Sequence, residues 1–339
     1  MKTNLHTRLT FALLMLIFAS ACSENAEQTS LQETTQIMTD TTDPISPNPF
    51  YSVSALVLQY PAFDQITTDH YLPAFERGMA EQIEEIAAIV NRADDPTFEN
   101  TMLPLEESGE LLSRVATVFF AMSSAHTNDA IDEIEVEIAP KLSTHQDQIF
   151  LDAGLFARVQ DLYERRDSLG LDAESVRLIE ENYKDFVRAG AQLDGEQKEQ
   201  LKAINLELAE LSTSFSQNVL DEVNAKAVVV DSAEELAGLT EAQIQTAADA
   251  AESRDMPGKF VIPLLNTSGQ PWLSSLENRA LRQRIHETSL SRGHSGGEFD
   301  NREILSRTAT LRAIKSSLLG FNNHAEYILQ NQTAQTVAA

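Results

Sequence analysis

The sequence predicts a mainly α-helical protein with one small two-stranded β element. From Asn48 onward, apolar residues recur at alternating spacings of three and four, which places them on one face of successive helices. Residues 227–230 and 259–265 are short apolar runs bounded by polar or turn residues, so they are typical of strands that pair with each other. No repeat of fixed period is present, which argues against a helical solenoid.

Capping residues and helix-breaking residues set where the expected helices begin and end. Asp69 can cap a helix over residues 70–90, and the loop at 93–101 ends it with Pro96. Thr240 and Gln243 form a capping box that opens a later helix. The remaining helices are expected at 105–124, 129–151, 156–168, 173–189, 196–226, 240–254, 276–291, 301–318 and 323–330.

The helix expected at 196–226 is the longest, and we expect the other helices to pack around it. Asp194 or Gly195 can open it, and neither Pro nor Gly interrupts its interior. One face carries a regular apolar series, namely Leu201, Ile204, Leu208, Leu211 and Phe215. Small polar residues such as Ser212 and Ser214 are poor choices for an exposed helix. They therefore indicate a central helix that is packed on several sides.

Composition and charge exclude some classes of partner. The 339 residues are 42% hydrophobic, which is enough for one large core or two moderate ones. Asp and Glu number 52 against 25 Lys and Arg, which gives a net charge of −27. A chain with this balance offers no basic patch to displace the counterions of phosphate groups. We expect no nucleic acid or anionic lipid partner.

The N-terminus has the features of an export signal. Residues 1–21 comprise a positively charged start, an apolar run too short to span a bilayer, and small residues at the end. Cys22, the only cysteine, follows at once, as in a bacterial lipobox. A lipobox usually has Leu where Ala19 stands, so ordinary cleavage that leaves Cys22 free is the alternative. We expect lipidation of Cys22 and an exported lipoprotein, anchored to a membrane and facing the periplasm or the cell exterior.

The segment at 22–47 is expected to be a disordered tether. It contains no aromatic residue, is rich in Thr, Gln and acidic residues, and ends in spaced prolines. Such a segment cannot bury enough apolar surface to offset its ordering entropy. The helical region is then expected to occupy residues 48–339.

Motifs for catalysis are weak. A zinc protease helix needs His-Glu-x-x-His, whose two imidazoles face one metal, but His286 is followed four residues later by Leu290. Residues 293–297 (Gly-His-Ser-Gly-Gly) fit the nucleophile elbow of serine hydrolases, yet a charged, helix-periodic segment precedes them instead of a buried strand. We expect His286 to be an ordinary helix residue and Ser295 to lie in a connecting loop. The residues alone predict no catalytic residue and no metal ligand.

Several sequence blocks resemble a known family. They are 96–101 (PTFENT), 105–109 (LEESG), 210–219 (ELSTSFSQNV), 235–239 (ELAGL) and 299–301 (FDN). They are similar to blocks of the zinc oligopeptidases, a family that includes thimet oligopeptidase, oligopeptidase A and bacterial peptidyl-dipeptidase (dipeptidyl carboxypeptidase). The resemblance runs in register from about Asn48 to Gln330, and it is nearest to the peptidyl-dipeptidase branch.

The resemblance implies two helical domains that flank a deep channel admitting only short peptides. In the family, zinc is held by His-Glu-x-x-His and a third Glu in the later half, and this chain stops at Ala339, before that half. We therefore expect the N-terminal, substrate-channel portion of an exported zinc peptidase, inactive alone, with short peptides and a C-terminal catalytic half as partners. Apolar helix faces after Leu276 are expected to need that half as a cover. The residues at helical spacing there are Leu305, Leu311, Ile314, Leu318, Leu319 and Phe321. The alternative is a non-catalytic helical lipoprotein that binds peptides or a partner.

Overall fold

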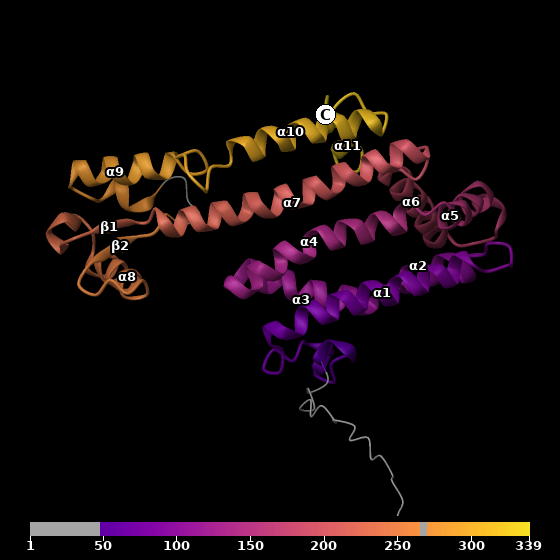
Figure 1. Ribbon diagram of the computed structural model, residues 1–339, viewed down its shortest axis with the longest axis horizontal. Helices are drawn as coiled ribbons and strands as arrows, with labels where there is room; N and C mark the ends of the chain where they lie inside the picture. The colour runs from indigo at the N-terminus through magenta and orange to yellow at the C-terminus, as the bar shows by residue number, and fades with distance from the viewer. Residues whose placement is uncertain (1–47, 265–269) are drawn as a thin grey trace, which may run out of the picture. The chain divides into compact units, whose positions relative to one another are not determined.

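A computed structural model describes residues 48–264 and 270–339. The expected signal peptide, Cys22 and the expected tether lie outside the described residues. In the described ranges α-helices dominate, and one antiparallel sheet pairs β1 (Val228–Val230) with β2 (Phe260–Ile262), with Val229 opposite Val261 (Figure 1). The predicted fold class, mainly α with one two-stranded element, is confirmed.

Several helices begin directly after a capping side chain, as Asp194 and Thr240 show. The expectation that Asp69 caps the first helix is wrong, because Asp69 lies inside the 3₁₀ turn at Thr68–His70 and that helix begins at Tyr71 without a side-chain cap. In chain order the α-helices of the described residues are α1 (Tyr71–Val90), α2 (Leu103–Glu107), α3 (Glu110–His126), α4 (Asp129–Phe150), α5 (Ala153–Arg165), α6 (Ala173–Ala189), α7 (Gly195–Ala225), α8 (Glu241–Glu252), α9 (Arg279–Leu290), α10 (Arg302–Leu318) and α11 (His324–Leu329). Single 3₁₀ turns lie at Pro49–Tyr51, Val57–Gln59, Thr68–His70, Arg166–Ser168, Ala233–Leu236 and Pro271–Ser274. Residues Phe98–Met102 form a π-helical turn.

The single helix expected at 105–124 is wrong, because the structure has two helices there. Ser108 adopts an extended backbone, and Gly109 follows with a φ of 76°, a left-handed conformation that side chains disfavour. A Cβ at Gly109 would also lie only 2.4 Å from Nε2 of Gln82 on α1. The chain therefore stops α2 at Glu107 and restarts at Glu110, with glycine at the joint.

Helix α7 begins where the sequence predicts, since the Asp194 carboxylate accepts a hydrogen bond from the Gln197 N–H at 2.9 Å. It lies against α4 and α10 (Figure 1). Leu201 and Ile204 are buried there. The expectation of a helix buried along its length is wrong for part of the second half, where Ser212, Ser214 and Phe215 are exposed while Thr213, Glu222 and Val223 are buried. The small hydroxyl side chains bond readily to water, so they can face it.

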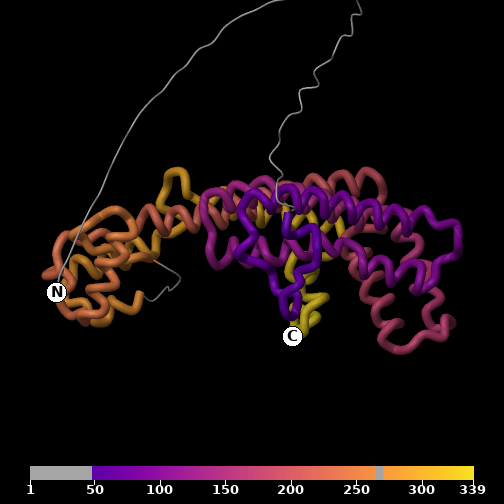
Figure 2. The backbone as a smooth tube through the Cα atoms, turned by 90° about the horizontal axis from the view of Figure 1, so that it is seen from below, coloured from indigo at the N-terminus to yellow at the C-terminus, as the bar shows by residue number. Residues whose placement is uncertain are grey.

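Three hydrophobic clusters hold the described residues together. The first core joins α1, α5 and α6 and includes Leu155, Leu162 and Phe186. The second core joins α1, α3 and the start of α4, and its rings Phe75 and Phe119 meet edge to face with centroids 5.3 Å apart. The third core surrounds the sheet and includes Leu236, Ile262, Leu281 and Ile285. Figures 1 and 2 both show the third core's elements at the end of α7 away from α5 and α6.

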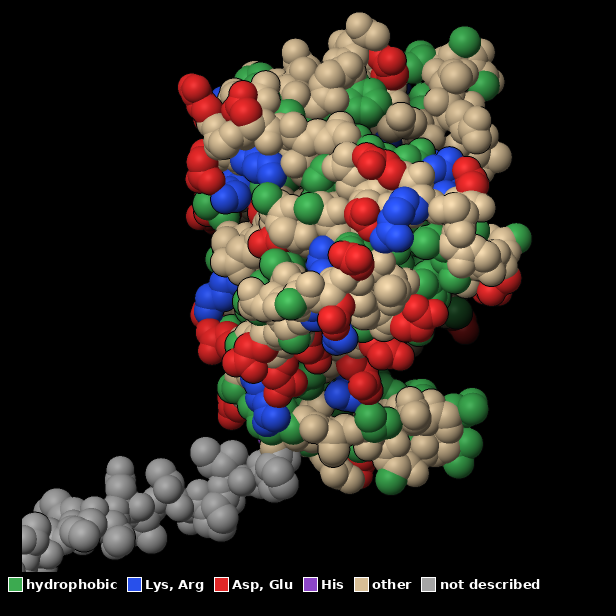
Figure 3. Space-filling model, turned by 90° about the vertical axis from the view of Figure 1, so that its right-hand side faces the viewer, with side chains coloured by type: hydrophobic (Ala, Val, Ile, Leu, Met, Phe, Trp, Pro, Cys, Tyr) green, Lys and Arg blue, Asp and Glu red, His purple; other side chains and the backbone are tan. Residues whose placement is uncertain are grey.

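The surface combines many charges with a few exposed apolar side chains. The face in Figure 3 shows acidic and basic side chains interspersed. Of the apolar residues expected to be exposed after Leu276, Leu305 and Ile314 are exposed. Leu318, Leu319 and Phe321 are half-buried, and the expectation is wrong for Leu311, which is buried. Val57 and Leu58 are 84% and 96% exposed in an uncharged segment near the start of the described residues. None of the described helices is long and apolar enough to cross a membrane.

The unequal burial of α7 predicts unequal costs of truncating its leucines. Leu201→Ala removes a fully buried side chain and should lower the free energy of unfolding by about 2–5 kcal/mol. The matched substitution Leu220→Ala, at a position that is 36% exposed, should change it by no more than about 1 kcal/mol. Urea denaturation of both variants provides the measurement. Equal costs at the two positions would contradict the packing of α7.

Candidate functional site

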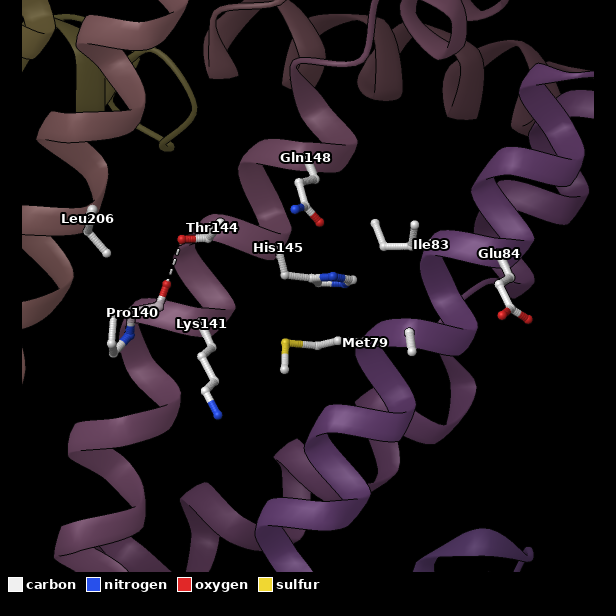
Figure 4. Close-up of a pocket in the computed structure, with 10 residues that line it drawn as sticks. Met79, Ile83, Glu84, Pro140, Lys141, Thr144, His145, Gln148 and Leu206 are labelled. Atoms are coloured by element: carbon white, nitrogen blue, oxygen red, sulfur yellow. Dashed lines mark hydrogen bonds between the residues drawn. The ribbon is translucent and has the colours of Figure 1, made fainter.

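A groove of about 610 Å³ runs between α1 and α4, with one side chain of α7 at its edge (Figure 4). On both helices the lining residues recur at spacings of three to five, which places them on one helical face. The lining residues are Met79, Ala80, Ile83 and Glu84 of α1, Pro140, Lys141, Thr144, His145 and Gln148 of α4, and Leu206 of α7.

The groove lies where two of the cores meet. Met79 packs against the second core, and Ile83, one turn further along α1, packs against the first. On the opposite wall Pro140 lies inside α4 and has no N–H to give to the helix. The Thr144 hydroxyl donates to the Pro140 carbonyl at 3.0 Å, as Figure 4 shows, so this part of the wall is satisfied within α4.

A charged clamp joins the two walls. Lys141 of α4 donates to Glu76 of α1 at 2.7 Å and to Glu137 of its own helix at 2.6 Å. The hydrogen bonds to Glu137 and Glu76 raise the pKa of Lys141 above its ordinary value. Because all three side chains are more than a third exposed, these ion pairs contribute little to stability.

His145 is the buried polar group of the groove. Its Nε2 lies 2.7 Å from Oε1 of Gln82, whose Nε2 in turn donates to the Ser108 hydroxyl at 3.3 Å. Since Oε1 of Gln82 accepts, Nε2 of His145 carries the proton and donates. Burial lowers the pKa of His145 below its ordinary value of 6.5. The imidazole is therefore held neutral in one tautomer and orientation.

The groove has the chemistry of a binding surface. Met79 and Ile83 offer apolar contact inside it and Leu206 offers more at its edge, while Thr144 and Gln148 offer polar groups. Its only imidazole, His145, is hydrogen-bonded to an amide and not to a nucleophile. Within residues 48–264 and 270–339, no three His, Cys, Asp or Glu side chains come together as a metal site would require.

The two motifs that resemble catalytic sites, His286 and the loop at 293–297, do not line the groove. His286 is exposed on α9. The helix α9, not a strand, precedes the loop at 293–297, so the nucleophile-elbow geometry is absent from it. Instead the Ser295 hydroxyl and the Gly293 N–H both donate to the buried Glu222 carboxylate of α7. Ser295 thus helps to fasten a loop, as the sequence predicts for a connecting segment.

The block at 96–101 proves to be a structural junction. Arg158 of α5 is 8% exposed and donates to Asn100 Oδ1 at 2.9 Å, Thr101 Oγ1 at 3.2 Å and the Asp94 carbonyl at 3.2 Å. These neutral acceptors surround the guanidinium and bind the π-helical turn to α5. A residue type expected at the surface is buried here because its donors are satisfied.

Two other blocks meet each other. Asn301, from the block at 299–301, is 3% exposed and accepts from Asn218 of α7 at 2.9 Å. Its own amide donates to the Phe215 carbonyl at 3.1 Å. Together with Glu222 these bonds fasten the loop at 291–301 to the second half of α7. The blocks that carry the family resemblance therefore include fold junctions.

Sequence reasoning did not single out the groove. Thr144 and Gln148, and Lys141 and His145, each stand four residues apart, so α4 carries two adjoining rows of polar groups. That pattern alone does not say which helix faces them. The side chains of Met79 and Ile83 on α1 pack partly against the cores and also line the groove, which the apolar period of that helix does not reveal.

Comparison with known proteins identifies relatives of one family. The chain is 42% identical over 292 residues to dipeptidyl carboxypeptidase of Escherichia coli and 42% identical over 295 residues to that of Salmonella typhimurium. It is 28% identical over 293 residues to oligopeptidase A of Haemophilus influenzae. These matches cover 85–87% of this chain but only 42–43% of each relative, so the chain spans less than half their length. No family model matches the chain.

These matches confirm the resemblance to the zinc oligopeptidase family, as a partial one. The higher identity to the dipeptidyl carboxypeptidases agrees with the branch that the sequence blocks indicate. The family is one of zinc enzymes, and no cluster that could hold a metal ion is present in the ranges 48–264 and 270–339.

The burial of His145 predicts a pH dependence of stability. Because its folded pKa lies below 6.5, protonation favours the unfolded chain. Its contribution is fully present above pH 6.5 and is lost as the pH falls from 6.5 towards the folded pKa. His145→Gln keeps a donor for Gln82 and does not titrate, so the loss of stability between about pH 7 and pH 5 should be smaller in this variant.

Urea denaturation at both pH values measures this difference. His286→Gln, on the exposed face of α9, serves as the matched control and should keep the pH dependence of the unmodified chain. An unchanged pH dependence in His145→Gln would show that the imidazole is not held neutral in the groove.

Proposed function

We propose that this chain forms the substrate-channel portion of an exported, zinc-dependent peptidyl-dipeptidase or oligopeptidase that hydrolyses short peptides. The observation that carries the proposal is the 42% identity with dipeptidyl carboxypeptidase over 292 residues. The matched relatives extend well beyond this chain, which spans 43% of their length. We assign the zinc and its ligands to that further part.

The groove between α1 and α4 supports a role in binding peptides. Its volume of about 610 Å³ lies within the range of about 300–1,000 Å³ typical of small-ligand sites. An apolar side chain of a peptide can pack on Met79, Ile83 and Leu206. The hydroxyl of Thr144 and the amide of Gln148 can meet the polar backbone of such a peptide.

The residues of this chain do not fit a catalytic zinc site. Such a site needs three protein ligands on one open face, and the sequence has no His-Glu-x-x-His. We therefore assign this chain the binding and positioning of the substrate, and no chemical step. In the complete family enzyme the zinc is expected to activate the water that attacks the peptide bond.

A chimaera tests this assignment. The chain is joined to the portion of Escherichia coli dipeptidyl carboxypeptidase outside the matched residues, and release of C-terminal dipeptides from an N-blocked tetrapeptide is measured. We expect chelator-sensitive hydrolysis by the chimaera and none by either part alone. Ala80→Trp fills the groove from an exposed position of α1 and should lower kcat/KM at least about tenfold, or about 1.4 kcal/mol.

The matched control is Ala88→Trp, which is exposed on the same helix but outside the groove and should leave kcat/KM unchanged. Chelator-sensitive hydrolysis by the chain alone would overturn the proposal. An inactive chimaera, with peptide binding by the isolated chain, would instead support the alternative of a non-catalytic peptide-binding lipoprotein.

We further propose that the chain is a lipoprotein anchored to a membrane through Cys22. The support is the signal-like segment at 1–21 and the position of Cys22 directly after it. The expected location is a membrane surface facing the periplasm or the cell exterior. The segment at 22–47 would then link the anchor to the helical region.

Cell fractionation in a bacterial host tests the anchor. The unmodified chain should sediment with membranes, because two or more acyl chains hold a protein there where one binds only marginally. Cys22→Ala should release it into the soluble fraction. Mass spectrometry that finds an unmodified N-terminus at Cys22 or later would contradict lipidation.

A further inference from the structure

A second cavity, of about 470 Å³, lies on another side of α4 from the groove. It is lined by residues of α4, α6, α7, α10 and α11, and in contrast to the groove most of its lining is polar or charged. The lining includes Asp147 of α4, Asp185 and Arg188 of α6, Asn205 of α7, Lys315 of α10 and Tyr327 of α11. No residue lines both the cavity and the groove.

Asp147 is a buried carboxylate with little compensation. It is 8% exposed, and its side chain accepts one hydrogen bond from the described residues, from Asn205 Nδ2 at 2.7 Å. Burial raises the pKa of Asp147, against the opposing effects of Asn205 and of the charges of Lys315 and Lys202. A carboxylate has room for several donors, so most of the acceptor capacity of Asp147 is unused.

Lys315 is the opposite charge of the cavity, and it is also incompletely compensated. Its ammonium donates to Asn205 Oδ1 at 2.6 Å, and within the described residues it forms no ion pair with a carboxylate. Burial lowers the pKa of Lys315, and the charge of Asp147 partly offsets this. The Asn205 amide thus stands between the two charges, with its oxygen on the ammonium and its nitrogen on the carboxylate.

The two other charged residues of the cavity differ in their partners: Arg188 is hydrogen-bonded, whereas Asp185 forms no ion pair with a described residue. Arg188 donates to the Tyr327 carbonyl at 2.9 Å and to Gln330 Oε1 at 2.7 Å, and its guanidinium lies 4.7 Å from the centre of the Tyr327 ring. Arg188 therefore fastens α11 to α6. Burial and the charge of Glu181 raise the pKa of Asp185.

The geometry points to a binding site for a small zwitterion of the amino-acid class, either a free amino acid or a dipeptide. Its ammonium would bind the Asp147 carboxylate, and its carboxylate would bind the Lys315 ammonium. A lone cation would meet Lys315 and Arg188, and a lone anion would meet Asp147 and Asp185. A zwitterion supplies an opposite charge to both Asp147 and Lys315. Folding has already removed much of the water from these two groups, so binding costs little further desolvation of them.

The size of the cavity agrees with this ligand class, since about 470 Å³ lies within the range of small-ligand sites. The inference goes beyond the proposed function and does not depend on it. Binding here needs no zinc and no hydrolysis, so either proposal can fail while the other stands.

Isothermal titration calorimetry of the full chain provides the test, with L-leucine and glycyl-L-leucine as probes. We expect at least one of them to bind, and the comparison decides between an amino acid and a dipeptide. N-acetyl-glycyl-L-leucine lacks the ammonium and glycyl-L-leucine amide lacks the carboxylate, so each should bind at least about tenfold more weakly than glycyl-L-leucine if the dipeptide is the ligand. If leucine is the ligand, N-acetyl-leucine and leucine amide serve in the same way.

Variants test the two named groups. Asp147→Asn and Lys315→Met should each weaken binding at least about tenfold. Lys259→Met, which removes an exposed lysine paired with Asp231 beside the sheet, is the matched control and should bind as the unmodified chain does. Circular dichroism verifies that each variant is folded.

The blocked ligands act on the unmodified protein, so they remain decisive if a variant fails to fold. Absence of binding of both probes to the unmodified chain would overturn the inference. Equal affinity for free and blocked ligands would overturn it as well, because neither charge of the ligand would then be recognised.

Discussion

The packing of the first half of α7 against α4 and α10 is the constraint on which the other features depend. Leu201 and Ile204 are buried in it, and Asn205 links Asp147 of α4 to Lys315 of α10. Neighbours on a helix diverge by about 100°, so Asn205 and Leu206 face different spaces. Asn205 faces the charged cavity, and Leu206 lies at the edge of the apolar groove. One helix therefore positions parts of two chemically opposite surfaces.

The helices could be predicted from the sequence because their signals are local. Asp194 caps α7, Thr240 and Gln243 cap α8, and the apolar period continues between the caps. The break at Gly109 was missed, since the surrounding segment keeps a helical pattern and the reason for the break is the approach of Gln82 from another helix. Exposure of part of the second half of α7 was missed for a similar reason. Small polar residues suit both a close helix contact and water, and the sequence does not tell which is present.

The candidate sites depend on contacts between distant segments, so they could not be predicted from the sequence pattern. His145 is held by Gln82, and Lys315 meets Asn205, which in turn meets Asp147. Each of these side chains is ordinary in its own helix, and its meaning comes from a partner at least 58 residues away. Conversely, the loop that matches a catalytic pattern letter for letter has a structural role, because the Ser295 hydroxyl donates a hydrogen bond to the Glu222 carboxylate. A sequence motif therefore marks a functional site only where the fold brings its residues into the geometry that the chemistry requires.

The fastening of the loop at 291–301 has a mechanical consequence for α7. The 31 residues of this helix would behave as a lever, with its buried first half as the fulcrum. At 1.5 Å per residue, a tilt of about 5° at Thr213 would displace Ala225 by about 1.5 Å. The bonds of the loop to Asn218 and Glu222 lie on the second half of the helix, which Gln217 also ties to the Asp132 carbonyl of α4, so they act as a brace. Because β1 follows the end of α7 directly, these bonds also resist displacement of the β1–β2 element relative to the loop.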